Sequence, residues 1–364
     1  MSSRRKFIKS SLLTSLAAPL ASIAAPVTNT FESNSNNKKW KHWVWVRPNK
    51  ADTTEKLQKE YETYYNAGIR GIFFEADSEK HFRAAKAQKL EAHRWMWTMN
   101  RGEASLLKAH PDWYAVNRIG ESCADKPPYV GYYRWLCPSR EEVAQYLEAD
   151  VKNILSKDYV DGIHLDYVRF CDVILPVNLW AQYNIVQKEE LPQYDYCYCN
   201  VCKQKFKEEK GQDIDSINYP EESLSWRQYR YDAITKIVNR LAKIANAQKK
   251  PITAAVFPTP EVARRIVRQD WTRWNLNAVY PMIYHGFYKE PVAWIGDAVQ
   301  EGVFNLHNKF PLYAGLYLPD FKSPAEVEEG MRLALQKGAA GISIFGNVTN
   351  EVLQALQNAS AKTT

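Results

Sequence analysis

Long apolar runs are scarce in this 364-residue chain. Beyond residue 25 none is long enough to span a bilayer, so we expect no stable membrane insertion. Net charge is also small, because residues 1–24 carry four positive charges and no negative one, and their removal lowers the formal balance from +7 to +3. This leaves little basis for binding nucleic acid. No pair of histidines has the spacing of metal ligands, so we expect catalysis to require no metal or other cofactor.

The first 24 residues have the parts of a bacterial export signal. A basic start (SRRKFIK, residues 3–9) precedes a small, mostly apolar stretch, and Ser22-Ile23-Ala24 suits cleavage after Ala24. The paired arginines match the twin-arginine type, which predicts the twin-arginine export machinery as a partner and a periplasmic or secreted location. The apolar stretch is too short and interrupted for a membrane anchor. Residues 25–39, polar and rich in Asn and Ser, are expected to form a disordered linker.

Short apolar runs alternate with helical patterns over residues 40–360. Eight runs separated by helices indicate a parallel sheet, and eight strands are the number that closes a (β/α)8 TIM barrel of the α/β class. The predicted strands are residues 43–46, 71–74, 92–97, 162–165, 252–257, 278–283, 312–316 and 341–345. The predicted helices include residues 54–67, 140–155, 225–248, 259–268 and 324–337. We therefore expect a single barrel domain.

Two stretches between predicted strands are long. One follows the third strand over residues 98–159, and the other follows the fourth over residues 168–251, with an insertion at about 171–224 that holds a group of cysteines. Both leave the C-terminal ends of strands, where the binding loops of a barrel belong. We expect them to form the walls of a cleft rather than separate domains.

The fourth strand is the most informative segment (VDGIHLDYVRF, residues 160–170). Its apolar residues are typical of a short buried strand, yet it carries His164, Asp166 and Arg169 toward its end. Charged groups are rarely buried unless they are paired. In a barrel the C-terminal strand ends carry the chemistry, so Asp166 is a candidate catalytic residue. The alternative is an ordinary strand with a structural Asp–Arg ion pair.

Several motifs together resemble a known family. They are HPDWYAVNRIG (residues 110–120), LCPS (136–139), VDGIHLDY (160–167), QDW (269–271), Trp274 and VYPMIY (279–284). In this order they resemble the bacterial family-10-like glycosyl hydrolases over most of residues 105–285. The resemblance implies a barrel, a carbohydrate ligand and a functional carboxylate at Asp166. The chain is also similar to the DGxxxD signature of family 18 chitinases, but Val168 replaces the acid that donates the proton there.

Glycoside hydrolysis usually needs a second carboxyl group. An opposite charge from Arg169 is expected to keep Asp166 ionised, which favours a nucleophile or a base. Glu75 ends the second strand in apolar surroundings that suit a general acid, so it ranks first as the partner. Asp320 after the seventh strand ranks second, and Glu261 after the fifth ranks third. Each of these acids can equally be a helix cap, a surface acid or part of an ion pair.

Other polar and aromatic residues cluster at the predicted strand ends. Aromatic faces stack on sugar rings while polar groups bond to hydroxyls, and the chain has 12 Trp and 22 Tyr. Each residue singly can be packing, but their shared location favours a sugar site. The predicted substrate-binding residues are Trp45, Arg47, Trp97, Asn100, Arg101, His164, Arg169, Tyr284, His285 and Tyr317.

Half of the cysteines lie close together in the sequence. The six are Cys123, Cys137, Cys171, Cys197, Cys199 and Cys202. The last three form C-x-C-x-x-C, and with Cys171 they can make a structural zinc site. Disulfides in an oxidising compartment are the competing interpretation, and Cys123 can pair with Cys137.

Three functions remain open on these observations. The first is an exported glycoside hydrolase that cleaves O-glycosidic bonds of a poly- or oligosaccharide through Asp166 and a second carboxyl group. The second is a carbohydrate-binding barrel without catalysis. The third and weakest is a polysaccharide lyase, in which Tyr284, His285 and Arg169 supply the base and the charge neutraliser.

Overall fold

The computed structural model describes residues 40–363 of the chain, which form one compact unit. The predicted signal at 1–24 and linker at 25–39 lie outside the described residues. Within residues 40–363, no helix combines the length and the apolar character that crossing a membrane requires.

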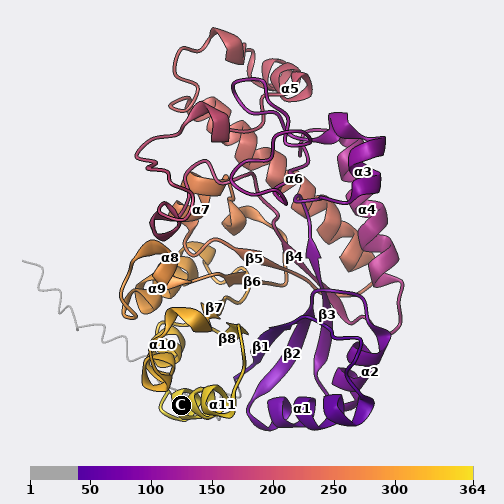
Figure 1. Cartoon of the computed structure of the whole chain (residues 1–364), viewed down its shortest axis with the longest axis vertical. Helices are drawn as coiled ribbons and strands as arrows, with labels where there is room; N and C mark the ends of the chain where they lie inside the picture. Colours follow the sequence, from indigo (N-terminus) through magenta and orange to yellow (C-terminus); the bar gives the residue numbers. More distant parts are fainter. Residues whose placement is uncertain (1–39, 364) are drawn as a thin grey trace, which may run out of the picture. The chain divides into compact units, whose positions relative to one another are not determined.

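Eight parallel strands form the centre of this unit (Figure 1). They are β1 (His42–Val46), β2 (Ile69–Phe74), β3 (Glu91–Trp97), β4 (Gly162–Asp166), β5 (Ile252–Val256), β6 (Ala278–Pro281), β7 (Tyr313–Tyr317) and β8 (Gly341–Phe345). Their order is β6-β5-β4-β3-β2-β1-β8-β7. The ends of this sheet meet. The Ile283 N–H donates to the Gly315 carbonyl at 2.8 Å, and parallel bridges join Val279 to Leu312 and Met282 to Gly315, at or beside β6 and β7. The predicted (β/α)8 barrel is confirmed.

Helices alternate with these strands and cover the barrel. They are α1 (Thr54–Asn66), α2 (Glu79–Ala87), α3 (Ala104–Ala109), α4 (Glu141–Leu155), α5 (Asn200–Lys210), α6 (Leu224–Ala247), α7 (Pro260–Val267), α8 (His285–Tyr288), α9 (Trp294–Leu306), α10 (Pro324–Gln336) and α11 (Asn350–Ala361). Local chemistry sets their starts. At α10 the Ser323 hydroxyl accepts a hydrogen bond from the Glu326 N–H, and Pro324 occupies the first turn.

The barrel interior is filled by aromatic side chains. Because successive strand residues point to opposite faces, alternate positions of every strand face inward. Trp43 stacks on Phe73 with ring centroids 4.7 Å apart, and Phe73 stacks on His164 at 3.7 Å. Gly71 makes room for Trp43, since a Cβ there would lie 2.2 Å from the indole ring. Asp166 follows His164 by two residues, so the same alternation brings it inward at the C-terminal rim.

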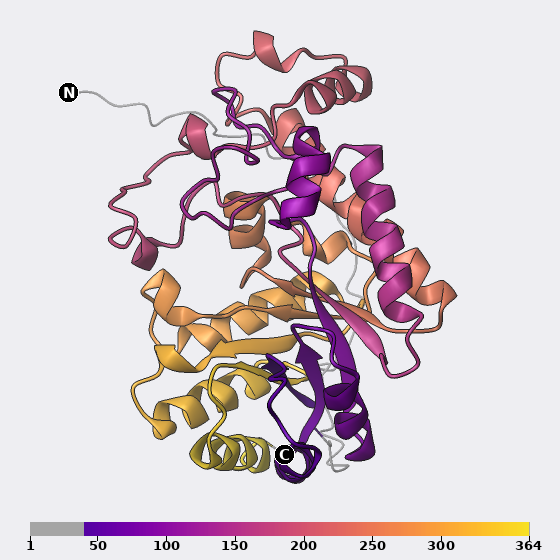
Figure 2. The same ribbon diagram turned by 45° about the vertical axis from the view of Figure 1, so that its right-hand side comes forward.

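Two long connections rise from that rim. The first connection (residues 98–140) joins β3 to α4 and contains α3, and the second connection (residues 167–223) joins β4 to α6 and contains α5. Both extend to the same side of the barrel, where α3 and α5 lie (Figures 1 and 2). These segments have little regular structure, and they wall the site described below.

Candidate active site

A cavity of about 390 Å³ opens at the C-terminal ends of the strands. Its floor comes from β1, β3 and β4. Its walls come from both long connections, from the residues that directly follow β1 and β2, and from residues at or just after the ends of β5 to β8. The lining is mostly aromatic, with two Arg and three acidic side chains. The lining residues are Trp45, Arg47, Glu75, Trp95, Trp97, Tyr132, Tyr133, Asp166, Tyr167, Arg169, Asp172, Pro176, Leu179, Gln182, Tyr183, Ala255, Phe257, Met282, Tyr284, Phe287, Tyr288, Tyr317 and Phe345.

Asp166 lies on the floor of this cavity and is 8% exposed. Its Oδ2 accepts a hydrogen bond from Trp95 Nε1 at 2.9 Å, and its Oδ1 accepts one from the Tyr167 backbone N–H at 2.6 Å. Tyr167 has a φ of 48°, in the left-handed region, which changes the direction of the chain just after Asp166. Burial raises the pKa of Asp166 above its usual value, and this effect exceeds the opposing effect of the two hydrogen bonds.

Arg169 does not form the expected ion pair with Asp166. Its Nη1 donates to Asp172 Oδ2 at 2.8 Å, and both side chains are buried in the cavity wall. The guanidinium also lies over the Trp135 ring, 4.6 Å from its centroid. The charge of Arg169 lowers the pKa of Asp166, but burial outweighs it. The expectation that Arg169 dominates the pKa of Asp166 is therefore wrong, because the guanidinium pairs with a closer carboxylate three residues further on.

Glu75 is the second acid that shares the cavity with Asp166. It follows β2 directly, where its backbone N–H donates to the Val46 carbonyl at 3.0 Å. Its carboxylate accepts two hydrogen bonds from the Arg47 guanidinium, one of them at 2.9 Å to Oε1. The negative charge of Glu75 contributes to the raised pKa of Asp166. The two carboxyl groups are thus electrostatically coupled within one cavity.

The other two predicted partners do not line the cavity. Asp320 follows β7, and its Oδ2 accepts a hydrogen bond from the Gly286 N–H at 3.0 Å. Burial raises the pKa of Asp320 as well. Glu261 lies in the first turn of α7, where an acid favours the helix N-terminus. The prediction of Asp320 as a catalytic residue is thus not supported by the cavity, and neither side chain lines it beside Asp166.

Six of the ten predicted substrate-binding residues line the cavity. They are Trp45, Arg47, Trp97, Arg169, Tyr284 and Tyr317. Asn100 and Arg101 instead line an adjoining hollow of about 640 Å³, which shares Glu75 and Trp97 with the cavity. Arg101 is ion-paired there with Asp150 at 2.6 Å.

Both predicted histidines are corrected to packing roles. His164 is fully buried in the barrel interior below Asp166, and its Nδ1 hydrogen-bonds the Thr253 hydroxyl at 2.8 Å. Burial holds the pKa of His164 well below its usual value, so the ring is neutral. His285 begins α8 and packs against the Phe321 ring at 4.8 Å. Neither ring lines the cavity.

Several residues in the wall of the cavity were not predicted from the sequence. Tyr132 and Tyr133 come from the first connection, and Asp172 and Tyr183 come from the second. The clustered tyrosines in YVGYYRW (residues 129–135) are the available signal for the first pair. Asp172 has only its spacing of three residues from Arg169, in a segment with no periodic pattern.

Four cysteines converge outside the cavity. Their Sγ atoms all lie within 4.8 Å of one another, and they are Cys137, Cys197, Cys199 and Cys202. The predicted set is thus corrected in one member, since Cys137 takes the place of Cys171. The Cys171 thiol lies 3.8 Å from the Asp172 carbonyl instead. The predicted pairing of Cys123 with Cys137 is also absent, because both are free thiols in the structure.

Comparison with known proteins identifies the family. The family model for glycosyl hydrolase-like 10 proteins matches residues 79–318, which include β3 to β7 and both long connections. The chain belongs to the glycosyl hydrolase-like 10 family. The expected resemblance is therefore confirmed, and Glu75 lies just before the matched region of this family member. No curated protein matches the chain in sequence.

Solved structures similar to this glycosyl hydrolase-like 10 protein include glycoside hydrolases. The glycoside hydrolase domain of PgaB (BpsB) from Bordetella bronchiseptica aligns with a TM-score of 0.63 and 10% identity, covering 89% of this chain and 97% of that one. The catalytic domain of a β-amylase from Paenibacillus polymyxa gives 0.60 and 10%, covering 89% and 99%. A β-galactosidase from Marinomonas ef1 gives 0.59 and 10%, covering 89% and 59%. At these identities the likeness establishes the fold alone.

Proposed function

We propose that the chain is an exported glycoside hydrolase that cleaves O-glycosidic bonds of a poly- or oligosaccharide, with Asp166 as the general acid and Glu75 as the second carboxyl group. The observation that carries this proposal is the environment of Asp166. It is a buried carboxyl group with a raised pKa on the floor of an aromatic cavity that also holds Glu75. A raised pKa keeps the proton available for a leaving oxygen.

The proposed roles reverse those expected from the sequence. Glu75 is ion-paired with Arg47, and its negative charge raises the pKa of Asp166. A carboxylate paired with a cation suits a base or a nucleophile, while a buried carboxyl group held by neutral donors suits an acid. The cavity's aromatic rings supply flat faces for stacking on sugar rings.

The adjoining hollow supports an extended substrate. It shares Glu75 and Trp97 with the cavity and adds Asn100, Lys157 and other polar side chains that can bond to sugar hydroxyls. A chain of several sugars can therefore occupy both hollows across the Asp166–Glu75 pair. Export through the twin-arginine route to the periplasm or beyond would bring the protein to such glycans.

The test is an assay of hydrolysis on a panel of poly- and oligosaccharides, in which the release of reducing ends is measured. Asp166→Asn and Glu75→Gln are each expected to lower kcat by about 100- to 10,000-fold, the usual effect of removing a general acid or base. The matched control is Asp320→Asn, because Asp320 is also a carboxyl group with a raised pKa but does not line the cavity. Full activity in Asp166→Asn would reject the assignment.

A carbohydrate-binding barrel without catalysis is the second candidate. It is favoured by one observation, namely that two of the three cavity acids, Glu75 and Asp172, are already neutralised by arginines. This candidate predicts glycan binding that survives Asp166→Asn and no product from any glycan. The lyase hypothesis loses support, because His285 lies off the cavity and Arg169 is paired with Asp172.

A further inference from the structure

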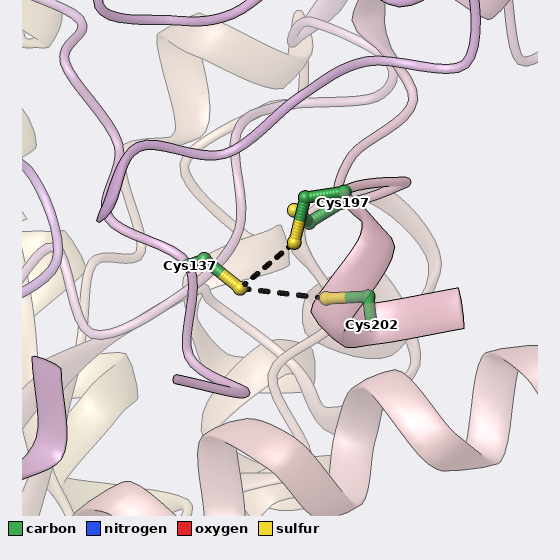
Figure 3. A group of neighbouring side chains, drawn as sticks. Cys137, Cys197 and Cys202 are labelled. Carbon is green, nitrogen blue, oxygen red and sulfur yellow. Dashed lines mark hydrogen bonds between the residues drawn. The ribbon is translucent and has the colours of Figure 1, made fainter. Parts of the chain in front are cut away.

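The cysteine cluster joins the two long connections that wall the cavity. Cys137 lies near the end of the first connection, and the other three cysteines belong to the second, where Cys199 caps α5 and Cys202 lies in its first turn. Figure 3 shows Cys137 facing Cys197 and Cys202 across the gap between the two segments. In sequence Cys137 lies 60 residues before Cys197, so the two segments meet only in the folded chain.

The geometry of the four sulfurs matches a tetrahedral metal site. Zinc–thiolate bonds of about 2.3 Å place the sulfurs of a regular tetrahedron about 3.8 Å apart. Here Cys137 Sγ lies 3.5 Å from Cys199 Sγ and 3.4 Å from Cys202 Sγ, and no sulfur pair exceeds 4.8 Å. A disulfide would require about 2.05 Å between one pair only. Four sulfurs gathered around one point are what a shared ion requires.

The surroundings suit thiolates. The Val116 backbone N–H donates to Cys197 Sγ at 3.4 Å, which is the kind of outer contact that stabilises a metal-bound sulfur. The N-terminal end of α5, which carries partial positive charge, lies at Cys199 and Cys202. All four cysteines are buried, so a site here would be closed and structural rather than catalytic.

We propose that Cys137, Cys197, Cys199 and Cys202 bind one structural zinc ion that fastens the two walls of the cavity to each other. The first connection carries Tyr132 and Tyr133 into the cavity, and the second carries Asp172 and Tyr183. The ion therefore holds both groups of cavity residues at a fixed separation. A twin-arginine signal is compatible with this role, because that route exports proteins after they have folded.

The first experiment is elemental analysis of the untagged, purified protein. We expect about one zinc per chain, and its loss in Cys137→Ser and Cys202→Ser. The matched controls are Cys123→Ser and Cys171→Ser, which remove buried cysteines outside the cluster and are expected to keep the zinc. Zinc retained by Cys137→Ser and lost from Cys171→Ser would overturn the assignment. So would a metal-free protein whose four cluster thiols react only after reduction, because that result shows disulfides.

A second measurement does not depend on the folding of any variant. Cobalt(II) exchanged into the wild-type protein is expected to give the intense visible and near-ultraviolet absorption of a tetrahedral four-thiolate site. Weak absorption typical of octahedral oxygen ligands would overturn the proposal, as would a stoichiometric metal other than zinc in the purified protein. Removal of the zinc by a chelator is expected to lower the melting temperature and to raise KM, because the walls of the cavity are no longer held together.

Discussion

The floor and the wall of the cavity are built in different ways. On the floor, Asp166 lies among aromatic side chains. Among residues 40–363, its oxygens accept hydrogen bonds only from neutral donors, Trp95 Nε1 and a backbone N–H. In the second connection, which forms part of the wall, buried carboxylates form ion pairs. Asp172 pairs with Arg169, and Asp195, which is fully buried, pairs with Arg230. The neutral donors do not cancel the effect of burial, so the pKa of Asp166 stays raised. The ion pairs, in contrast, stabilise the conformation of the irregular connections. The difference separates a group poised to exchange a proton from groups that maintain shape.

The largest expected effect on stability comes from removing an ion pair in the wall. Asp172→Asn removes the charge that Arg169 faces, and Arg169 is only 6% exposed. A buried cation left without its counter-charge is expected to lower the free energy of unfolding by about 3 kcal/mol. Asp166→Asn leaves no buried cation without a counter-charge, so it is expected to lower that free energy by no more than about 1 kcal/mol, the value of one hydrogen bond.

Denaturant unfolding of both variants at pH 7 measures this contrast. Asp215→Asn is the control, since its ion pair with Lys203 lies at the surface and such pairs contribute about 1 kcal/mol at most. Equal stabilities for the Asp172 and Asp166 variants would show that the floor and the wall do not differ in the way described.

The next effect concerns stability as a function of pH. Because the pKa of folded Asp166 is raised above its usual 3.8, its contribution to stability is full below that value. The contribution is lost as the pH rises through the raised pKa, by about 1.4 kcal/mol for each pH unit that separates the folded from the unfolded pKa. Asp166→Asn therefore becomes more stable relative to wild type between low and neutral pH. A stability difference that is constant with pH would contradict the raised pKa.

A substitution at Trp95 tests the effect of a neutral donor on the pKa of Asp166. Its hydrogen bond lowers the pKa of Asp166, so Trp95→Phe is expected to raise that pKa further. A hydrogen bond to a charged group contributes about 1.5 kcal/mol, which corresponds to about one pH unit. If Asp166 acts as the acid, the alkaline limb of the kcat/KM profile moves upward by that amount. If the alkaline limb does not move, the titration that it reports belongs to another group.

The floor can be predicted from the sequence because its residues lie on strands, where side chains alternate between the two faces. Alternation along strands places His164 and Asp166 on the inner face, and the recurring apolar runs predict all eight strands. The same rule does not tell a packing residue from a cavity residue, which depends on height along the barrel axis. For this reason the prediction of His164 as a substrate-binding residue is wrong, since it lies one layer too deep.

The wall could not be predicted because its contacts have no period. Cys137 joins the cysteine cluster across 60 residues of sequence, whereas Cys171 is favoured by sequence reasoning only because it lies nearer. Arg169 pairs with Asp172 instead of Asp166, in a segment that begins with a turn after β4 where Tyr167 takes a left-handed conformation. Such a turn in a non-glycine residue leaves no clear mark in a single sequence.

The smallest expected effect on folding is at the outer edge of the wall. Tyr132 is 51% exposed and lies 6.0 Å from the Trp97 ring, at the cavity mouth. Tyr132→Ala is expected to change the free energy of unfolding by less than about 0.5 kcal/mol, as surface substitutions usually do. A lost stacking face is nevertheless expected to raise KM about fivefold to tenfold, for about 1 kcal/mol of aromatic contact. An unchanged KM would place the bound sugar on the floor alone, out of reach of the first connection.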